Sequence, residues 1–157
     1  MDEYIINRYN LSQYSLLRAQ LVKLDEDIRI AEDELAELNK YSMNVNSVLT
    51  GMPSGNEKRD KIAEFIIRLE NDKARLDKLL TDFIAERDYI KYRLYKIRAA
   101  VNQVTNKQLR EIIQWYYFDG ESAIEIAKKT YMTRDAVYKK MDRFFCITQR
   151  QERARQE

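Results

Sequence analysis

The sequence has 157 residues, of which 34% are charged and 45% hydrophobic, and it contains three glycines and one proline. A charged fraction well above the usual ~25%, together with so few helix breakers, is typical of proteins built from long helices. The shortage of glycine also disfavours β-rich and doubly wound α/β domains, whose turns depend on that residue. We therefore expect an all-α protein.

Missing residue types exclude several kinds of active site. The chain has no histidine, and Cys146 is its only cysteine. A Ser-His-Asp triad, a histidine or cysteine-rich metal site and an internal disulfide are therefore excluded. The three glycines are too dispersed for a phosphate-binding loop, and the sequence has neither an apolar run of ~18 residues nor a signal peptide. We expect a cytoplasmic protein that is not an enzyme, holds no cofactor or metal and does not contact a membrane.

Positive charge gathers toward the C-terminus, although the formal net charge of the chain is only +2. Residues 1–40 carry 5 basic and 9 acidic side chains, whereas residues 126–155 carry 9 basic and 3 acidic ones. An anionic partner is therefore expected at the C-terminal end of the chain.

Two heptad patterns predict an antiparallel coiled-coil hairpin over residues 1–104. The first helix is predicted from about residue 2 to 40 and the second from about 58 to 103, because apolar residues alternate at spacings of three and four. The predicted seam positions are Leu17, Leu21, Leu24, Ile28, Ala31, Leu35 and Leu38, followed by Ile62, Ile66, Leu69, Lys73, Leu76, Leu80, Phe83, Arg87, Ile90, Leu94, Ile97 and Val101. Since a two-helix core is thin, a homo-oligomer through this arm is a further expectation.

The segment between the two helices, at about 41–57, holds the only proline and two of the three glycines, and it is predicted as a loop. Its apolar residues fit two interpretations equally well. They could pack over the tip of the hairpin, or they could bind a partner.

Residues 105–149 predict a helix-turn-helix, and residues 150–157 a charged tail. An amphipathic helix starting near Asn106 is expected to end at Asp119-Gly120. The predicted caps of the next two helices are Ser122, with Glu125 three residues later, and Thr133. The predicted apolar stripe of the last helix is Val137, Met141 and Phe144. A short helix, a tight break at 130–132 and a second capped helix are typical of this DNA-binding motif.

The run LREIIQWYYFDGESAIEIAKKTYMTRDAVYKKMDRFF resembles the helix-turn-helix of sigma-factor region 4, although Tyr131 stands where glycine is common in the turn. The matching elements are the Tyr/Phe-rich end of the first helix, Asp119-Gly120, Glu125-Ile126-Ala127, Thr133 and Val137. The heptad arm and the LTGMPSGN loop followed by Asp60 resemble small phage proteins of the ArpU/RinA type. This resemblance implies a phage or prophage late-gene regulator associated with the nucleoid, with double-stranded DNA and host RNA polymerase as candidate partners.

The outer face of the last predicted helix is the candidate DNA-binding surface. With the apolar stripe inward, helical periodicity turns Asp135, Tyr138 and Lys139 outward, and Arg134 lies at the helix start, where side chains reach base edges in this motif. The whole candidate set is Lys128, Lys129, Thr133, Arg134, Asp135, Tyr138, Lys139, Lys140 and Arg143. The side chains expected at phosphates are Lys128, Lys129, Lys140 and Arg143. The alternative interpretation is a solvated charged face in a helical bundle.

Two further stretches have competing interpretations. Residues 87–98 interleave tyrosines with basic residues, a pattern that can stack on single-stranded bases. The favoured interpretation is that the tyrosines flank the coiled-coil seam while the basic side chains extend along its edges; a variant of it is a phosphate-facing flank beside the helix-turn-helix. The acidic runs at 25–27 and 32–34 are interpreted as a solvated face or as partners of basic residues on the second helix.

Together these patterns predict a sequence-specific, double-stranded DNA-binding transcriptional regulator. One alternative is a DNA-packaging recognition subunit of the small-terminase kind, which would combine the same motif with helical assembly. Another is a coiled-coil adaptor whose helix-turn-helix contacts proteins.

Overall fold

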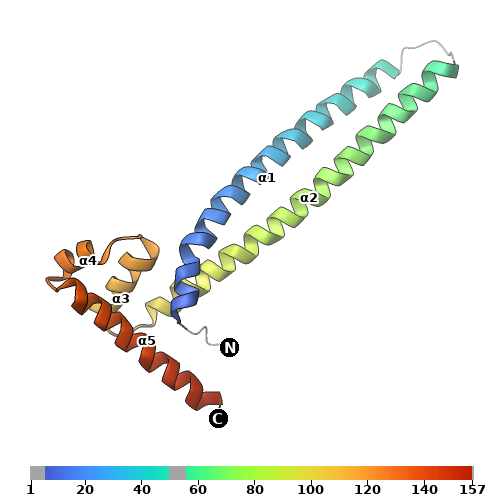
Figure 1. Ribbon diagram of the computed structural model, residues 1–157. Helices are drawn as coiled ribbons and strands as arrows, with labels where there is room; N and C mark the ends of the chain where they lie inside the picture. Colours follow the sequence, from blue (N-terminus) through green and yellow to red (C-terminus); the bar gives the residue numbers. More distant parts are fainter. Residues whose placement is uncertain (1–5, 50–55, 157) are drawn as a thin grey trace. The chain divides into compact units, whose positions relative to one another are not determined.

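The computed structural model describes residues 6–49 and 56–156, and the side chains of residues 6–42 and 61–148. Within these ranges all regular structure is helical (Figure 1), which confirms the all-α prediction. The elements are α1 (Arg8–Leu49), α2 (Asn56–Asn102), α3 (Lys107–Ile113), the π-helical turn η1 (Gln114–Phe118), α4 (Ala123–Thr130) and α5 (Arg134–Gln156). Over the described residues, no helix combines the length and the apolar character needed to cross a membrane.

Helices α1 and α2 run antiparallel and pack against each other, as the heptad patterns predict (Figure 1). Every predicted seam position is buried or half-buried. Lys73 and Arg87 interrupt the apolar seam and keep only 16% and 27% of their side-chain surface exposed. Their charged ends reach Glu70 at 3.7 Å and Asp88 at 3.3 Å. The alkyl stems therefore cover the seam while the charges stay near water.

The ends of the hairpin helices differ from the prediction. Helix α1 starts at Arg8, after Asn7, whose side chain accepts a hydrogen bond from the backbone N–H of Asn10 at 2.7 Å. It continues to Leu49, and α2 already begins at Asn56, so the predicted loop at 41–57 is too long. Residues 41–49 contain no glycine or proline, and nothing in the sequence ends the helix there. The side chains from residue 43 to 60, on which the two interpretations of the loop depend, lie outside the described residues.

The acidic runs of α1 find their basic partner on their own helix. Arg29 donates to Glu26 at 2.6 Å and to Asp33 at 3.4 Å. All three side chains are more than half exposed, so these pairs contribute little to stability. The interpretation as a solvated face therefore describes the runs better than pairing with α2.

The described residues form two compact units. Unit 1 contains the described residues up to Leu21 together with those from Ile90 onward, and unit 2 is Val22–Tyr89. Unit 2 consists of the helix pair alone. Unit 1 adds α3, η1, α4 and α5 to the other ends of α1 and α2, and its α5 continues to Gln156. The partition into 1–104 and 105–149 stays a prediction.

Unit 1 has a well-buried core drawn from α1, α2, α3, α4 and α5. Its largest fully buried side chains are Leu11, Ile97, Val101, Ile112, Ile113, Ile126 and Val137. Tyr14 of α1 links three elements, because its ring lies 4.1 Å from that of Phe118 and its hydroxyl accepts a hydrogen bond from Arg98 at 2.6 Å. The core therefore fixes the C-terminal helices against the ends of the long pair.

Candidate nucleic-acid interface

The helix that leads into the candidate interface ends in a wider π turn. Asn106 caps α3 by accepting the backbone N–H of Leu109 at 3.0 Å. The following residues 114–118 form η1, in which Asp119 N–H donates to the carbonyl of Gln114 at 3.1 Å. A π turn changes the direction of successive side chains, and the aromatic residues of η1 contact both α1 and α5. Gly120 then adopts φ +71°, a conformation that favours glycine.

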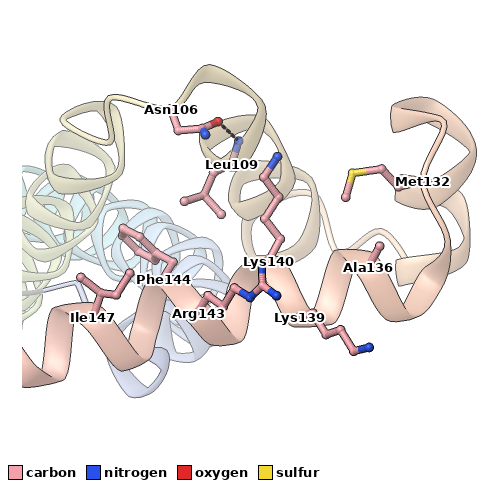
Figure 2. Close-up of a pocket in the computed structure, with 9 residues that line it drawn as sticks. All are labelled: Asn106, Leu109, Met132, Ala136, Lys139, Lys140, Arg143, Phe144 and Ile147. Atoms are coloured by element: carbon pink, nitrogen blue, oxygen red, sulfur yellow. Dashed lines mark hydrogen bonds between the residues drawn. The ribbon is translucent and has the colours of Figure 1, made fainter.

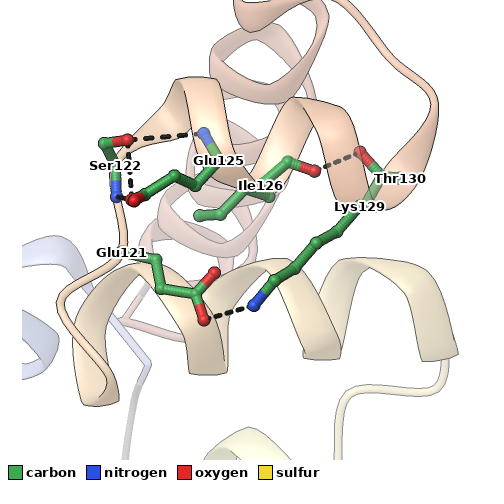
Figure 3. A network of polar contacts seen from close by, with 6 residues as sticks. All are labelled: Glu121, Ser122, Glu125, Ile126, Lys129 and Thr130. Carbon is green, nitrogen blue, oxygen red and sulfur yellow. Dashed lines mark hydrogen bonds and ion pairs between the residues drawn. The ribbon is translucent and has the colours of Figure 1, made fainter.

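The predicted capping box at the start of α4 is confirmed (Figure 3). The Glu125 N–H donates to Ser122 Oγ at 3.3 Å, and the Ser122 N–H donates to Glu125 Oε2 at 2.8 Å. The hydrogen bond from the Ser122 backbone is the main cause that lowers the pKa of the Glu125 carboxyl. Two otherwise unpaired N–H groups at the helix start are thereby satisfied.

The turn between α4 and α5 is tight, and a non-glycine residue occupies its left-handed position. Tyr131 has φ 55° and ψ 37°, and its side chain is 97% exposed. The N–H of Met132 closes the turn on the carbonyl of Ala127 at 3.0 Å. Thr133 then caps α5, because its hydroxyl accepts the N–H of Ala136 at 3.2 Å. Thr133 therefore caps the start of α5, as the sequence predicts.

The register of α5 agrees with the prediction except at the last position of the apolar stripe. Val137 and Met141 are 0% and 3% exposed, and the third buried residue is Phe145, at 3%. The predicted third residue, Phe144, is only half-buried. Phe145 is the more buried of the two because it packs against the aromatic η1 turn, where Tyr117 meets its ring edge-on with 6.3 Å between the ring centres.

Most of the predicted DNA-binding set is accessible. Eight of its nine members are exposed, and only Lys140 is half-buried. Three cations of the set, Lys128, Lys139 and Arg143, make no ion pair or hydrogen bond with the part of the chain that the structure describes. A polyanion could therefore bind these three without first breaking an internal contact.

The other two lysines are engaged within unit 1. Lys140 points across a groove of about 450 Å³ and donates to the side chain of Gln108 (Figure 2). Lys129 pairs with Glu121 at 2.5 Å and lies 5.2 Å from the centre of the Trp115 ring (Figure 3). Both lysines thus hold α4 and α5 against α3 and η1. Their predicted phosphate contacts would require these bonds to be exchanged.

The groove lies between α5 and the start of α3 and combines an apolar lining with basic side chains (Figure 2). Its lining residues are Asn106, Leu109, Met132, Ala136, Lys139, Lys140, Arg143, Phe144 and Ile147. Lys139 and Arg143 lie on the flank of α5 that borders this groove. The positive face of α5 therefore continues from the candidate DNA-binding surface to the groove.

The opposite flank of α5 contains a contact that the sequence pattern does not indicate. Arg8, at the start of α1, forms an ion pair with Asp142, and its guanidinium lies 5.3 Å from the centre of the Phe145 ring. Asp142 would otherwise repel phosphates near α5. Tyr138 lies on the same flank and meets Tyr116 edge-on at 6.4 Å. No local sequence pattern could have predicted this contact, because Arg8 and Asp142 are 134 positions apart.

The chain matches no protein-family model, no curated protein and no solved structure. Among the described side chains, no group of three or more carboxylates and thiols is arranged to hold a metal ion.

Proposed function

We propose that the protein is a sequence-specific, double-stranded DNA-binding transcriptional regulator that inserts the start of α5 into the major groove. The observation that carries this proposal is the exposed, internally unpaired trio Lys128, Lys139 and Arg143 around a capped helix-turn-helix. Cations that make no internal ion pair or hydrogen bond gain the most from phosphates, because no such bond has to be broken on binding. The exposed start of α5 is the part of this motif that reaches base edges.

The charge of unit 1 supports the proposal. Residues 1–21 and 90–157 carry 17 basic and 10 acidic side chains, and Arg8 forms an ion pair with Asp142 on the face of α5. Within the proposed interface, Arg134, Tyr138 and Lys139 read base edges, and Asp135 accepts a hydrogen bond from cytosine. Lys128 and Arg143 bind phosphates. Lys129 and Lys140 contribute mainly to the packing that holds these groups in position.

The biological setting is proposed from the resemblance to ArpU/RinA-type proteins. On this basis the protein acts on late genes of a phage or prophage, in the cytoplasm of the bacterial host and in association with the nucleoid. Host RNA polymerase is the proposed protein partner, and self-association through the helix pair is a further part of the proposal.

The experiment is selection of bound sites from a random duplex library, followed by affinity measurements on the selected site across a salt series. We expect an enriched motif and a log K that falls with log[salt]. The double variant Lys128→Ala/Arg143→Ala should flatten this slope by about 1.8, at about 0.9 per phosphate contact. The matched control, Lys61→Ala/Lys78→Ala, removes two exposed lysines from unit 2 and should leave the slope unchanged.

Failure to enrich any motif, together with no salt-sensitive binding to duplex, would contradict the proposal and favour the adaptor interpretation. Mapping the bound sites on the phage genome separates the two DNA-binding interpretations. Sites at a late promoter support a regulator, whereas sites beside the packaging genes support a packaging subunit.

A further inference from the structure

The last turns of α2, within unit 1, present a second aromatic and basic surface. Tyr92 and Tyr95 are 56% and 69% exposed. Lys91 and Lys96 lie on the same face, because at 3.6 residues per turn the four side chains span an arc of about 140°. We call these four residues the tyrosine patch.

The tyrosine patch lies beside the coiled-coil seam, and its two rings are exposed. The seam residues Leu94 and Ile97 are half-buried and buried, whereas Tyr92 and Tyr95 face outward. Lys96 lies 5.3 Å from the centre of the Tyr92 ring, so one face of that ring already interacts with a cation. The rings are held on a rigid helix without contributing to its core.

The charge around the tyrosine patch favours a polyanion. Residues 89–110 contain six basic residues and no acidic one. The nearest carboxylate before this run, Asp88, is 3.3 Å from Arg87 and is thereby neutralised. An acidic protein surface or a nucleic acid would satisfy this charge, and a single-stranded nucleic acid is favoured because each of its bases offers a flat ring on which an exposed tyrosine can stack.

We propose that the tyrosine patch binds single-stranded DNA by stacking unpaired bases on Tyr92 and Tyr95, while Lys91 and Lys96 contact the phosphates. Side chains three positions apart on a helix have Cβ atoms about 5–6 Å apart, which exceeds the ~3.4 Å rise between stacked nucleotides of one duplex strand. The spacing therefore suits a strand whose bases have separated. This activity adds to the proposed duplex recognition by α5 and uses different residues.

The test measures binding of the full chain to fluorescent oligo(dT) and to duplex of equal length. The double variant Tyr92→Ala/Tyr95→Ala should weaken oligo(dT) binding by about tenfold or more, as expected for lost base stacking. The variant Tyr92→Phe/Tyr95→Phe keeps both rings and should bind within about twofold of the unchanged protein, because stacking needs the ring and not the hydroxyl. Tyr9→Ala is the matched control, since Tyr9 is also 69% exposed but lies on α1.

Two results with these variants would overturn the proposal. Equal losses for the phenylalanine and alanine variants would mean that the hydroxyls bind phosphates, and a loss confined to duplex would make the patch a flank of the helix-turn-helix interface. Ultraviolet crosslinking to oligo(dT) uses the unchanged protein, so its result does not depend on whether a variant folds. Its adducts should map to Tyr92 or Tyr95, and adducts found only on other residues would contradict the assignment.

The proposals for α5 and for the tyrosine patch can fail separately. Lys139→Ala/Arg143→Ala should lower duplex affinity and leave oligo(dT) binding unchanged. If that variant loses both activities equally, the strand binds at α5 and the tyrosine patch has no role of its own.

Discussion

Units 1 and 2 use the same two long helices in different ways. In unit 2, Val22–Tyr89, the pair is stabilised by a single seam, and apolar side chains such as Val22 and Phe65 stay 67% and 49% exposed. In unit 1 the ends of the same helices meet α3, α4 and α5, and side chains such as Ile112 and Val137 are completely buried. Tertiary packing therefore supplies most of the stability of unit 1, whereas unit 2 depends on its heptad repeat.

The two units also differ in charge. Residues 22–89, in unit 2, carry 11 basic and 16 acidic side chains, whereas residues 1–21 and 90–157, in unit 1, carry 17 and 10. An anionic partner is attracted to one unit and repelled by the other. The proposed DNA contacts belong to the positively charged unit 1, so substitutions in unit 1 should separate them from self-association through the helix pair of unit 2.

The largest expected effect comes from a charge placed in the core of unit 1. Val137→Asp should destabilise this unit by about 4 kcal/mol or more, because a carboxylate with no partner would be buried between α4 and α5. Thermal melts should show the loss, and hydrogen exchange should locate it in unit 1. Val22→Asp, at a site that is 67% exposed in unit 2, is the matched control and should melt nearly as the unchanged protein does. An unchanged melt for Val137→Asp would mean that the register of α5 is wrong.

A smaller loss of stability is expected when aspartate replaces a buried apolar residue in the seam of unit 2. Ile28 is 5% exposed, and Ile28→Asp should cost about 2–4 kcal/mol, because water is closer in a two-helix pair and can partly hydrate the carboxylate. Hydrogen-exchange measurements should show reduced protection of the backbone amides in unit 2. Ile30→Asp, two positions away and at 45% exposure, is the control.

Size-exclusion chromatography of the Ile28 and Ile30 variants tests the predicted self-association. A smaller particle for Ile30→Asp with an unchanged melt would assign the exposed face of α1 to a subunit interface. An Ile28→Asp protein with unchanged stability would contradict the hairpin seam.

The sequence predicted the features that depend on neighbouring residues. The seam follows from a repeat of three and four positions, and the Ser122–Glu125 box from a spacing of three, so both were found in the correct place. Which of two adjacent aromatic residues is buried is harder to predict. Phe144 and Phe145 lie three and four positions after Met141, so both fit a helical apolar stripe. The choice between them depends on Tyr117, which belongs to another element.

Features that depend on distant residues could not be predicted. Arg8 pairs with Asp142 only after α1 and α5 have packed together. The engagement of Lys129 with Glu121 and Trp115 likewise depends on the path of η1. The sequence therefore indicated which cations belong to the candidate surface, but it could not separate the free ones from those already bound.

Within unit 1, substitutions at the start of α5 should separate base recognition from phosphate binding. Arg134→Ala and Tyr138→Ala should each weaken binding to the selected site by about 1–3 kcal/mol and weaken binding to scrambled duplex much less. Lys128→Ala is the contrasting variant, since loss of a phosphate contact should weaken both duplexes alike. Competition titrations on the two duplexes provide the measurement. Equal losses on both for Arg134→Ala and Tyr138→Ala would show that these residues contact only the backbone and that sequence is read elsewhere.

The smallest expected effect is the pH dependence of the capping box in unit 1. Hydrogen bonds from Ser122 lower the pKa of Glu125 below its ordinary value of 4.5. A carboxyl whose pKa is lowered by folding stabilises the folded state above its unfolded pKa, and it loses that contribution as the pH falls through the folded value. The melting temperature of the unchanged protein should therefore exceed that of Glu125→Ala by a constant amount near neutral pH. The difference should shrink below pH ~4.5 as the carboxylate is protonated.

Ser122→Ala provides the control for the capping box, because it removes the hydroxyl that caps α4 and should cost about 0.5–2 kcal/mol at neutral pH. The variant keeps the backbone N–H that donates to Glu125 at 2.8 Å. Part of the pH dependence should therefore survive in Ser122→Ala and vanish in Glu125→Ala. Melts recorded from pH 7 to pH 3 measure both differences. If the two variants lose the pH dependence equally, the hydroxyl and not the backbone N–H is what lowers the pKa of Glu125.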